Sequence, residues 1–243
     1  STISSALQEV FGLIRNESPY SIPQIVVGPG EHLLDGGLLL INQSNIIIRG
    51  TVERDSKTGQ VTKSLTKIIG RIRIESGVAN VHLKDMKICN PRGAGIFCTG
   101  KGTTAYLTNC KISGCRGNGI YVRQGALCEM NECNVSNNDS TGIAAWDPKT
   151  TLTIKDTDIH TNQGDGANAS TGANLSIVGK TRIRSNSGNC LRTLDNEASI
   201  VIADSSKCEG SQSGNIKSEE EAAAEMANEE DDDDDEEEDT MIV

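Results

Sequence analysis

Short runs of alternating apolar and polar residues recur along most of the chain. Runs such as Val81-His82-Leu83 and Ile120-Tyr121-Val122 place apolar side chains two positions apart, which is the period of a β-strand. Gly, Asn, Asp and Ser separate the runs and favour turns, because they tolerate positive φ or bond their own backbone. The pattern predicts many short strands joined by tight turns, with too little helical periodicity for βαβ units.

The runs themselves repeat at a nearly constant interval. Aligned anchors, at intervals of 24, 23, 24, 24 and 24 residues, are Leu83, Leu107, Met130, Ile154, Val178 and Ile202. Twelve residues after the anchors come Gly95, Gly119, Gly142, Gly166, Cys190 and Gly214. Three short strands and three turns in each repeat wind the chain into a coil, and like strands of successive coils stack about 4.8 Å apart. The repeat therefore predicts a solenoid in which each coil needs its neighbour.

Two phrases of the repeat, HLKDMKI…GAGIFC and YLTNCKI…GNGIYV, carry an N-x-I…GI pattern. This pattern resembles the short repeats of the right-handed parallel β-helix in the pectin-lyase-like superfamily. The resemblance implies an all-β, right-handed solenoid of about eight coils over residues 24–216. The same fold serves polysaccharide enzymes and non-catalytic intracellular modules, including the β-helix regions of certain F-box proteins. The resemblance is therefore informative about fold and not about function.

Both ends of the chain differ from the repeat. Residues 1–23 carry apolar residues at helical spacing, namely Ile3, Leu7, Val10, Phe11 and Ile14, which predicts a helix capping the first coil. Residues 217–243 are a low-complexity acidic run of the kind that is usually disordered. The expected organisation is a cap, a β-helix domain and a disordered acidic tail.

The net charge of −11 belongs to that tail. Residues 217–243 hold 15 acidic residues and one basic residue, which leaves 22 basic and 19 acidic residues in positions 1–216. A body of about +3, without a basic stripe interleaved with aromatic residues, argues against a nucleic-acid partner. The lack of any 18-residue apolar stretch argues against a membrane partner. The tail itself offers contacts to basic partners.

The chain has only six aromatic residues, which indicates a narrow interior filled by small side chains. The columns predicted to point inward are Met86, Cys110, Cys133, Thr157, Thr181 and Ser205, and Cys98, Val122, Ala145, Ala169 and Thr193. Cys110 and Cys133 fall about one coil apart, so either a disulfide or two buried thiols fits. Thiols are favoured because six Asn-x-Ser/Thr sequons would burden a secreted protein. An intracellular location is therefore predicted, cytoplasmic or nuclear, although secretion stays open because a removed leader leaves no trace.

A polar column follows the anchors by two residues: Asp85, Asn109, Glu132, Asp156, Lys180 and Asp204. Turn chemistry explains this column better than a calcium site, because Asn109 and Lys180 interrupt the carboxylates and calcium needs converging oxygens at one level. No cysteine or histidine spacing matches a zinc site. We therefore predict neither a metal nor a cofactor.

The leading functional hypothesis rests on planar side chains predicted to face outward on adjacent coils: Phe97, Tyr121, Arg123 and Trp146. Exposed aromatic residues with arginine are the usual anchors of a recognition surface. They predict a non-catalytic module that binds a protein partner. Sugar rings could stack on the same surface, so a carbohydrate is the alternative ligand.

The alternative function is that of a carbohydrate-active enzyme: a polysaccharide lyase, hydrolase or epimerase. Its candidate catalytic residues are Asp158, His160, Asp165 and Arg182, because these reactions need a base with a cation or paired carboxylates. The tandem Asp-Asp and His-Gly elements of the hydrolases are absent from the sequence, and no long insertion is expected to build a cleft. A binding module is therefore favoured over an enzyme.

Overall fold

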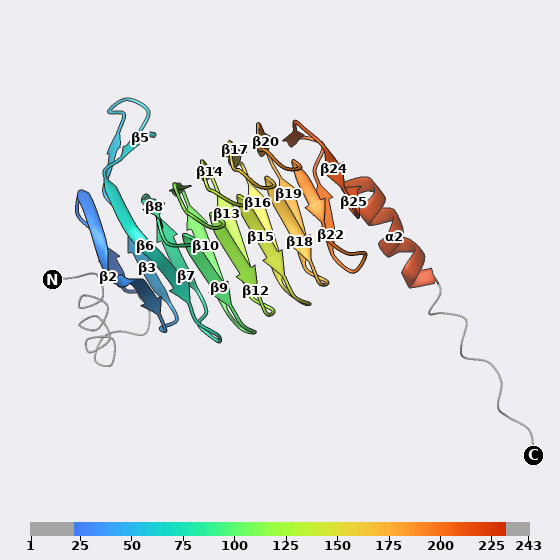
Figure 1. The fold of residues 1–243 in the computed structure, drawn as a ribbon, viewed down its shortest axis with the longest axis horizontal. Coiled ribbons are helices and arrows are strands. Elements are labelled where there is room, and N and C mark those ends of the chain that lie inside the picture. Colours follow the sequence, from blue (N-terminus) through green and yellow to red (C-terminus); the bar gives the residue numbers. More distant parts are fainter. Residues whose placement is uncertain (1–21, 232–243) are drawn as a thin grey trace, which may run out of the picture.

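The computed structural model describes residues 22–231, and these wind into a right-handed β-helix of about eight coils. Figure 1 shows the coils stacked side by side along one long axis. The predicted N-terminal helix lies outside the described residues, and residues 232–243 of the acidic tail also lie outside them. None of the helices in the described part of the chain is long and apolar enough to cross a membrane.

One face of the solenoid is a sheet of nine strands that pair in chain order and in parallel. Its strands are β1 (Gln24–Val26), β3 (Ile46–Arg49), β7 (Val81–Lys84), β10 (Thr104–Thr108), β13 (Leu127–Asn131), β16 (Thr151–Lys155), β19 (Asn174–Val178), β22 (Ser199–Ile202) and β25 (Ile216–Ser218). Because each coil contributes one strand, side chains at equivalent positions stack in columns.

A 14-stranded sheet forms the other two faces. One of its limbs contains β8 (Lys87–Cys89), β11 (Lys111–Ser113), β14 (Asn134–Ser136), β17 (Asp158–His160), β20 (Arg182–Arg184) and β23 (Lys207–Cys208). The other contains β9 (Ile96–Thr99), β12 (Ile120–Arg123), β15 (Ile143–Trp146), β18 (Ala167–Ser170), β21 (Leu191–Thr193) and β24 (Gln212–Ser213). The limbs meet at the long strand β6 (Thr66–Ile74), which also pairs with β2 (Gly30–Ile41).

The strand register confirms most of the predicted alignment. Leu83, Leu107, Met130 and Ile154 stack in one column. The next member is Ile177, however, and not the predicted Val178. The turn between β18 and β19 has three residues where the preceding coil has four, so the register shifts by one. Ile177 is buried and Val178 is partly exposed, as alternation along a strand requires.

The predicted inward columns are buried with one exception. Ten of their eleven side chains are at most 6% exposed, and the exception is Ser205. The turn after β22 holds four residues, 203–206, and Ser205 donates from this turn to the carbonyl of Gly179. Small stacked side chains therefore fill the bore, which is consistent with the scarcity of aromatic residues.

Cys110 and Cys133 are neighbouring buried thiols, as predicted. A hydrogen bond with Cys133, together with burial, raises the pKa of the Cys110 thiol well above its ordinary value, so this thiol is uncharged and inert. The structure pairs Cys190 with Cys208 in a disulfide, with Cα atoms 5.9 Å apart. The sequence did not predict this link.

The predicted disordered tail is wrong for its first part, because α2 (Glu219–Asp231) is a helix. It begins with a capping box: the backbone N–H of Glu221 donates to Ser218 Oγ, and Ser218 N–H donates to Glu221 Oε2 at 2.8 Å. Acidic residues fill the first turn, where the helix dipole favours them. The β-helix also runs past the predicted end at residue 216, because β25 extends to Ser218.

Candidate functional site

Three aromatic rings form a continuous strip across β9, β12 and β15. Phe97 pairs in register with Tyr121, and their ring centroids lie 5.3 Å apart at 63°. Tyr121 meets Trp146 at 5.8 Å and 85°. Both contacts are edge-to-face, an arrangement that aromatic quadrupoles favour. Phe97, Tyr121, Trp146 and Arg123 together are called the aromatic face below.

Two guanidinium groups hold the rings in place. Arg73 lies 5.4 Å from the ring centre of Phe97, and Arg123 lies 5.9 Å from that of Tyr121. Arg123 Nε also donates to Asp147 Oδ2 at 3.0 Å, which fixes the guanidinium beside the ring. Because these cation–π and ion-pair contacts order the side chains before a ligand arrives, binding loses less side-chain entropy.

The aromatic face is only partly open to solvent. Trp146 is 38% exposed, whereas Phe97, Tyr121 and Arg123 are half-buried. Ala144 pairs with Tyr121 on the same outward side and is nevertheless 1% exposed, so the surrounding side chains cover the strand. Burial raises the pKa of the Tyr121 phenol, which keeps it neutral near pH 7. The face therefore offers one projecting indole on a packed apolar base.

The structure brings Asp158 and His160 together on β17. The His160 Nε2 lies 3.8 Å from Asp158 Oδ2, and Asn134 Nδ2 lies 3.2 Å from the same histidine nitrogen. Asp158 is in register with Arg182, as the repeat predicted, but its ion-pair partner is Arg184, whose Nη2 donates to Asp158 Oδ2 at 2.8 Å. The RIR run made both Arg182 and Arg184 candidates, and the sequence predicted Arg182 as the neighbour of Asp158, whereas the ion pair forms with Arg184.

Asp165 has a separate role from Asp158 and His160. It lies in the turn before β18 and is 8% exposed. Its Oδ1 accepts from the backbone N–H of Asn189 at 2.8 Å, and its Oδ2 accepts from Asn168 Nδ2 at 3.3 Å. The bond from Asn189 joins successive coils and the bond from Asn168 lies within one coil, so both carboxylate oxygens stabilise the turn.

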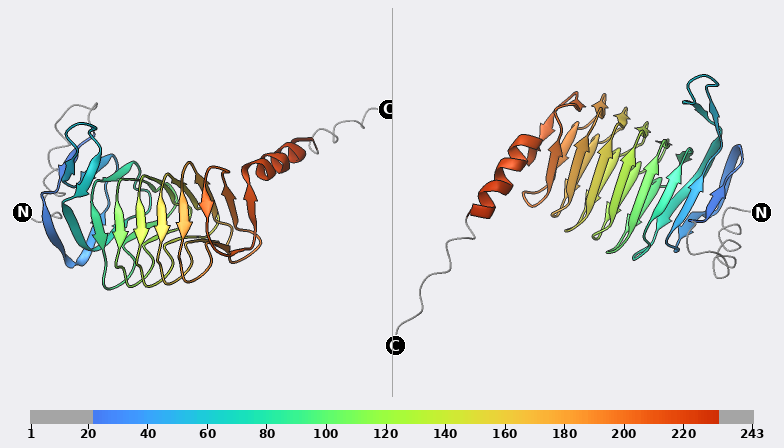
Figure 2. Two further views of the ribbon diagram at one scale, coloured as in Figure 1. Left: turned by 90° about the horizontal axis from the view of Figure 1, so that it is seen from above. Right: turned by 180° about the vertical axis from the view of Figure 1, so that it is seen from behind.

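The structure contains a groove where none was predicted. Residues 52–64 leave the coil as an antiparallel hairpin of β4 (Val52–Arg54) and β5 (Val61–Ser64), which projects from the solenoid in Figures 1 and 2. Beneath it lie depressions of about 640 and 270 Å³. The first is lined by Arg49, Arg54, Gln60, Val61, Lys84, Asp85, Thr108, Asn109 and Glu132. The second shares Val61, Asn109 and Glu132 with it and adds Thr62, Lys63, Ser64, Lys87, Cys110, Lys111 and Asn134.

We call these two adjoining depressions the hairpin groove. A sequence signal for it exists, because Ile48 pairs with Leu83, 35 residues further on, whereas the aligned positions from Leu83 to Ile202 repeat at about 24. This coil is therefore longer than the repeat, and its additional residues form the hairpin of β4 and β5 outside the coil.

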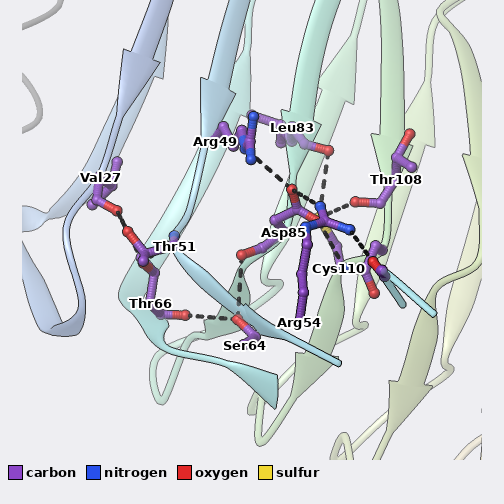
Figure 3. Close-up of polar contacts among 12 residues, drawn as sticks. Val27, Arg49, Thr51, Arg54, Ser64, Thr66, Leu83, Asp85, Thr108 and Cys110 are labelled. Carbon is purple, nitrogen blue, oxygen red and sulfur yellow. Dashed lines mark hydrogen bonds and ion pairs between the residues drawn. The ribbon is translucent and has the colours of Figure 1, made fainter. Parts of the chain in front are cut away.

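Asp85 forms the polar centre of the hairpin groove (Figure 3). Its Oδ2 lies 3.3 Å from Arg49 Nε and 3.7 Å from Arg54 Nη2, and its Oδ1 accepts from Asn109 Nδ2 at 2.7 Å. Asp85, Asn109, Glu132 and Asp156 all have φ between 48° and 60°, so turn chemistry explains this polar column. Among the described residues, no group of His, Cys, Asp and Glu is arranged to hold a metal.

A family model of the right-handed β-helix region matches residues 94–218, which is more than half of the chain. The chain belongs to the right-handed β-helix family. No curated protein matches its sequence at a significant level. The evidence for its relatives therefore comes from solved structures.

Three solved structures are similar to this β-helix. Pectate lyase Pel9A has a TM-score of 0.51 at 10% identity, over 85% of this chain and 71% of the lyase. The capsular polysaccharide depolymerase tailspike gp49 of Acinetobacter baumannii bacteriophage Fri1 has a TM-score of 0.48 at 12% identity, over 90% of this chain. The A-module of Azotobacter vinelandii mannuronan C-5 epimerase AlgE4 scores 0.41 at 11% identity, over 89% of this chain and 90% of the module. This chain covers 54% of the tailspike, and at these identities the likeness concerns the fold alone.

Proposed function

We propose that this β-helix is a non-catalytic interaction module that binds a partner protein through its aromatic face. The observation that carries the proposal is the ordered strip of three rings and two guanidinium groups on neighbouring strands. Tryptophan, tyrosine and arginine dominate the binding energy of protein interfaces. In a chain with six aromatic residues, half of them gather at this one place. An intracellular setting is part of the same proposal and is supported by the six free cysteines, whereas the Cys190–Cys208 disulfide argues against it.

The protein is expected to lose affinity for its partner when the central ring, Tyr121, and the projecting ring, Trp146, are removed. Full-length protein first captures the partner, and the Kd is then measured by titration for wild type and for the Tyr121→Ala/Trp146→Ala variant. We expect a rise in Kd of about 100-fold or more, because each buried anchor contributes roughly 2 kcal/mol or more. A melting curve measured alongside confirms that the variant is folded.

The matched control removes a ring pair from a different face. His82 and Tyr106 stack at 4.7 Å on β7 and β10 of the nine-stranded sheet. The His82→Ala/Tyr106→Ala variant should bind the partner like wild type. An unchanged Kd in Tyr121→Ala/Trp146→Ala would refute the aromatic face as the binding site.

The second candidate function is carbohydrate chemistry at Asp158. One observation favours it: Asp158 Oδ1 is buried and has no hydrogen-bond partner among the described residues, while Oδ2 holds Arg184. A carboxylate with one free oxygen can act as a general base, and the neighbouring arginine can neutralise the charge of the substrate. Asp158 has such a free oxygen and lies beside Arg184 and His160. The fold is shared with pectate lyase.

A direct assay separates the two functions. The protein is incubated with uronate-containing and neutral glycans, and released products are measured. Our proposal predicts no product from either class. Turnover that Asp158→Asn abolishes, and that an Arg192→Ala change on the neighbouring limb of the sheet leaves intact, would reverse the preference.

A further inference from the structure

The hairpin groove concentrates positive charge. Six cationic side chains line it, with two carboxylates: Arg49, Arg54, Lys63, Lys84, Lys87 and Lys111 against Asp85 and Glu132. Its excess of four cations exceeds the excess of three that positions 1–216 carry in total, with 22 basic and 19 acidic residues. The rest of the β-helix is therefore nearly balanced, and the groove is its electropositive site.

Two of these lysines occupy like-charged positions that folding alone does not require. Lys87 and Lys111 are in register on β8 and β11, and neighbouring strands lie about 4.8 Å apart. Like charges in this position destabilise a sheet. Neither ammonium group has a carboxylate within 4.0 Å among the residues whose side chains the structure describes. An anion bound between them would remove the repulsion.

The groove is preformed, because hydrogen bonds fix the root of the hairpin. Thr51 N–H donates to Thr66 Oγ1 at 2.8 Å, and Thr51 Oγ1 donates to the carbonyl of Val27 at 3.0 Å. Gly50 allows the close approach, since a Cβ there would lie 2.3 Å from the carbonyl oxygen of Asp85. Figure 3 shows Thr51, Thr66 and Ser64 joining the hairpin to the coil beside Asp85. The wall of the groove is therefore held in place without a ligand.

The lining chemistry favours an acidic peptide over a sugar. None of the lining residues is aromatic, so a sugar ring finds no surface on which to stack, and Asp85 is occupied by two arginines and Asn109. In an extended run of consecutive acidic residues, each side of the chain presents a carboxylate about every 6.6 Å. Such a run can pair with the lysine and arginine side chains of the groove in several alignments, because every residue of the run is acidic.

This chain contains such a run. Positions 229–239 consist only of Asp and Glu. They begin within α2 at the last coil, whereas the hairpin groove lies among the first coils, at the opposite end of the solenoid (Figures 1 and 2). Opposite charges at opposite ends favour a head-to-tail contact between copies. We propose that the hairpin groove binds the acidic run 229–239 of a second copy of this chain.

Sedimentation of the full-length protein tests the proposal. At about 20 mM salt the average molecular mass in solution should rise with protein concentration. At about 300 mM salt it should return to the mass of a monomer, because salt screens the attraction between exposed charges. The Lys87→Gln/Lys111→Gln variant should weaken association about tenfold or more. Its control, Lys155→Gln/Lys180→Gln, removes the same charge from exposed sites outside the groove and should associate like wild type.

A second readout excludes simple unfolding. Lys87→Gln/Lys111→Gln relieves a like-charge pair, so its melting temperature at low salt should be unchanged or higher by about 1–2 °C. A synthetic peptide of residues 229–239 added in excess should dissociate the wild-type oligomer.

Three outcomes would overturn the proposal. The first is a monomer at every concentration in low salt, and the second is association that the lysine changes leave unaffected. An oligogalacturonate that binds the groove more tightly than the acidic peptide would also overturn it and would make the groove a carbohydrate site. Alanine changes in the aromatic face should not affect this association, so the two proposals fail separately.

Discussion

Replacing Asn162 with alanine is expected to lower the free energy of unfolding by about 3–5 kcal/mol. Asn162 is 1% exposed and lies in a turn stacked between the turns of Asn138 and Asn186. Its Oδ1 accepts from Asn138 Nδ2 at 2.9 Å and from the backbone N–H of Asn138 at 3.2 Å. Its Nδ2 donates to Asn186 Oδ1 at 2.9 Å and to the carbonyl of Val135 at 3.1 Å.

Alanine removes all four of these bonds and supplies none. The backbone N–H of Asn138, in the turn after β14, and the carbonyl of Val135, in β14, then lose these partners in the buried interior, and each unsatisfied group costs about 1–3 kcal/mol. A small cavity adds to the loss. Urea denaturation followed by circular dichroism measures the effect.

Asn174→Ala is the matched control, because Asn174 is exposed and its side-chain Oδ1 accepts one bond, from Ser199 Oγ. We expect this change to cost less than about 1 kcal/mol. Equal losses in the two variants would contradict the importance of the buried asparagine stack.

Replacing Gly142 with alanine is expected to cost about 2–3 kcal/mol. The added Cβ would lie 2.7 Å from the carbonyl oxygen of Gly166, 2.8 Å from Asn162 Nδ2 and 3.0 Å from Ile159. The nearest of these is backbone of the next coil, which cannot move without disturbing the stack. The glycine is needed because of this close approach.

Gly28→Ala is the comparison, because a Cβ at Gly28 meets nothing within 4 Å. It should leave the urea midpoint nearly unchanged, while Gly142→Ala lowers it. If Gly142→Ala were as stable as wild type, the coils would have to separate more easily than their packing indicates.

The sequence alone predicted most of the fold because the β-helix is periodic. A 24-residue interval and period-two alternation placed Leu83, Leu107, Met130 and Ile154 in one column, since in-register stacking brings equivalent residues together. The same reasoning placed Phe97 beside Tyr121 on neighbouring strands. It also found the glycine column, although not the carbonyl of the next coil that requires it.

The sequence did not predict where turn length changes. A turn shortened by one residue put Ile177 in place of Val178. The sequence also did not predict the choice of ion-pair partner, because Arg184 pairs with Asp158 although Arg182 is the residue in register with it. Neither difference leaves a signal in the local sequence. Ser218 and Glu221 have the spacing of a capping box, which would have predicted the helix. The acidic composition of the segment led instead to the prediction of disorder.

What the sequence by itself determined is a repeating strand pattern, a narrow core of small side chains and the outward placement of the rings. Only the tertiary structure decided which polar groups meet across coils. Asn138, Asn162 and Asn186 are 24 residues apart, and the cations of the hairpin groove come from the hairpin and from several different coils. Their contacts depend on the positions of stacked turns and of an inserted hairpin, which are set by packing between coils and not by the local pattern of any one of them.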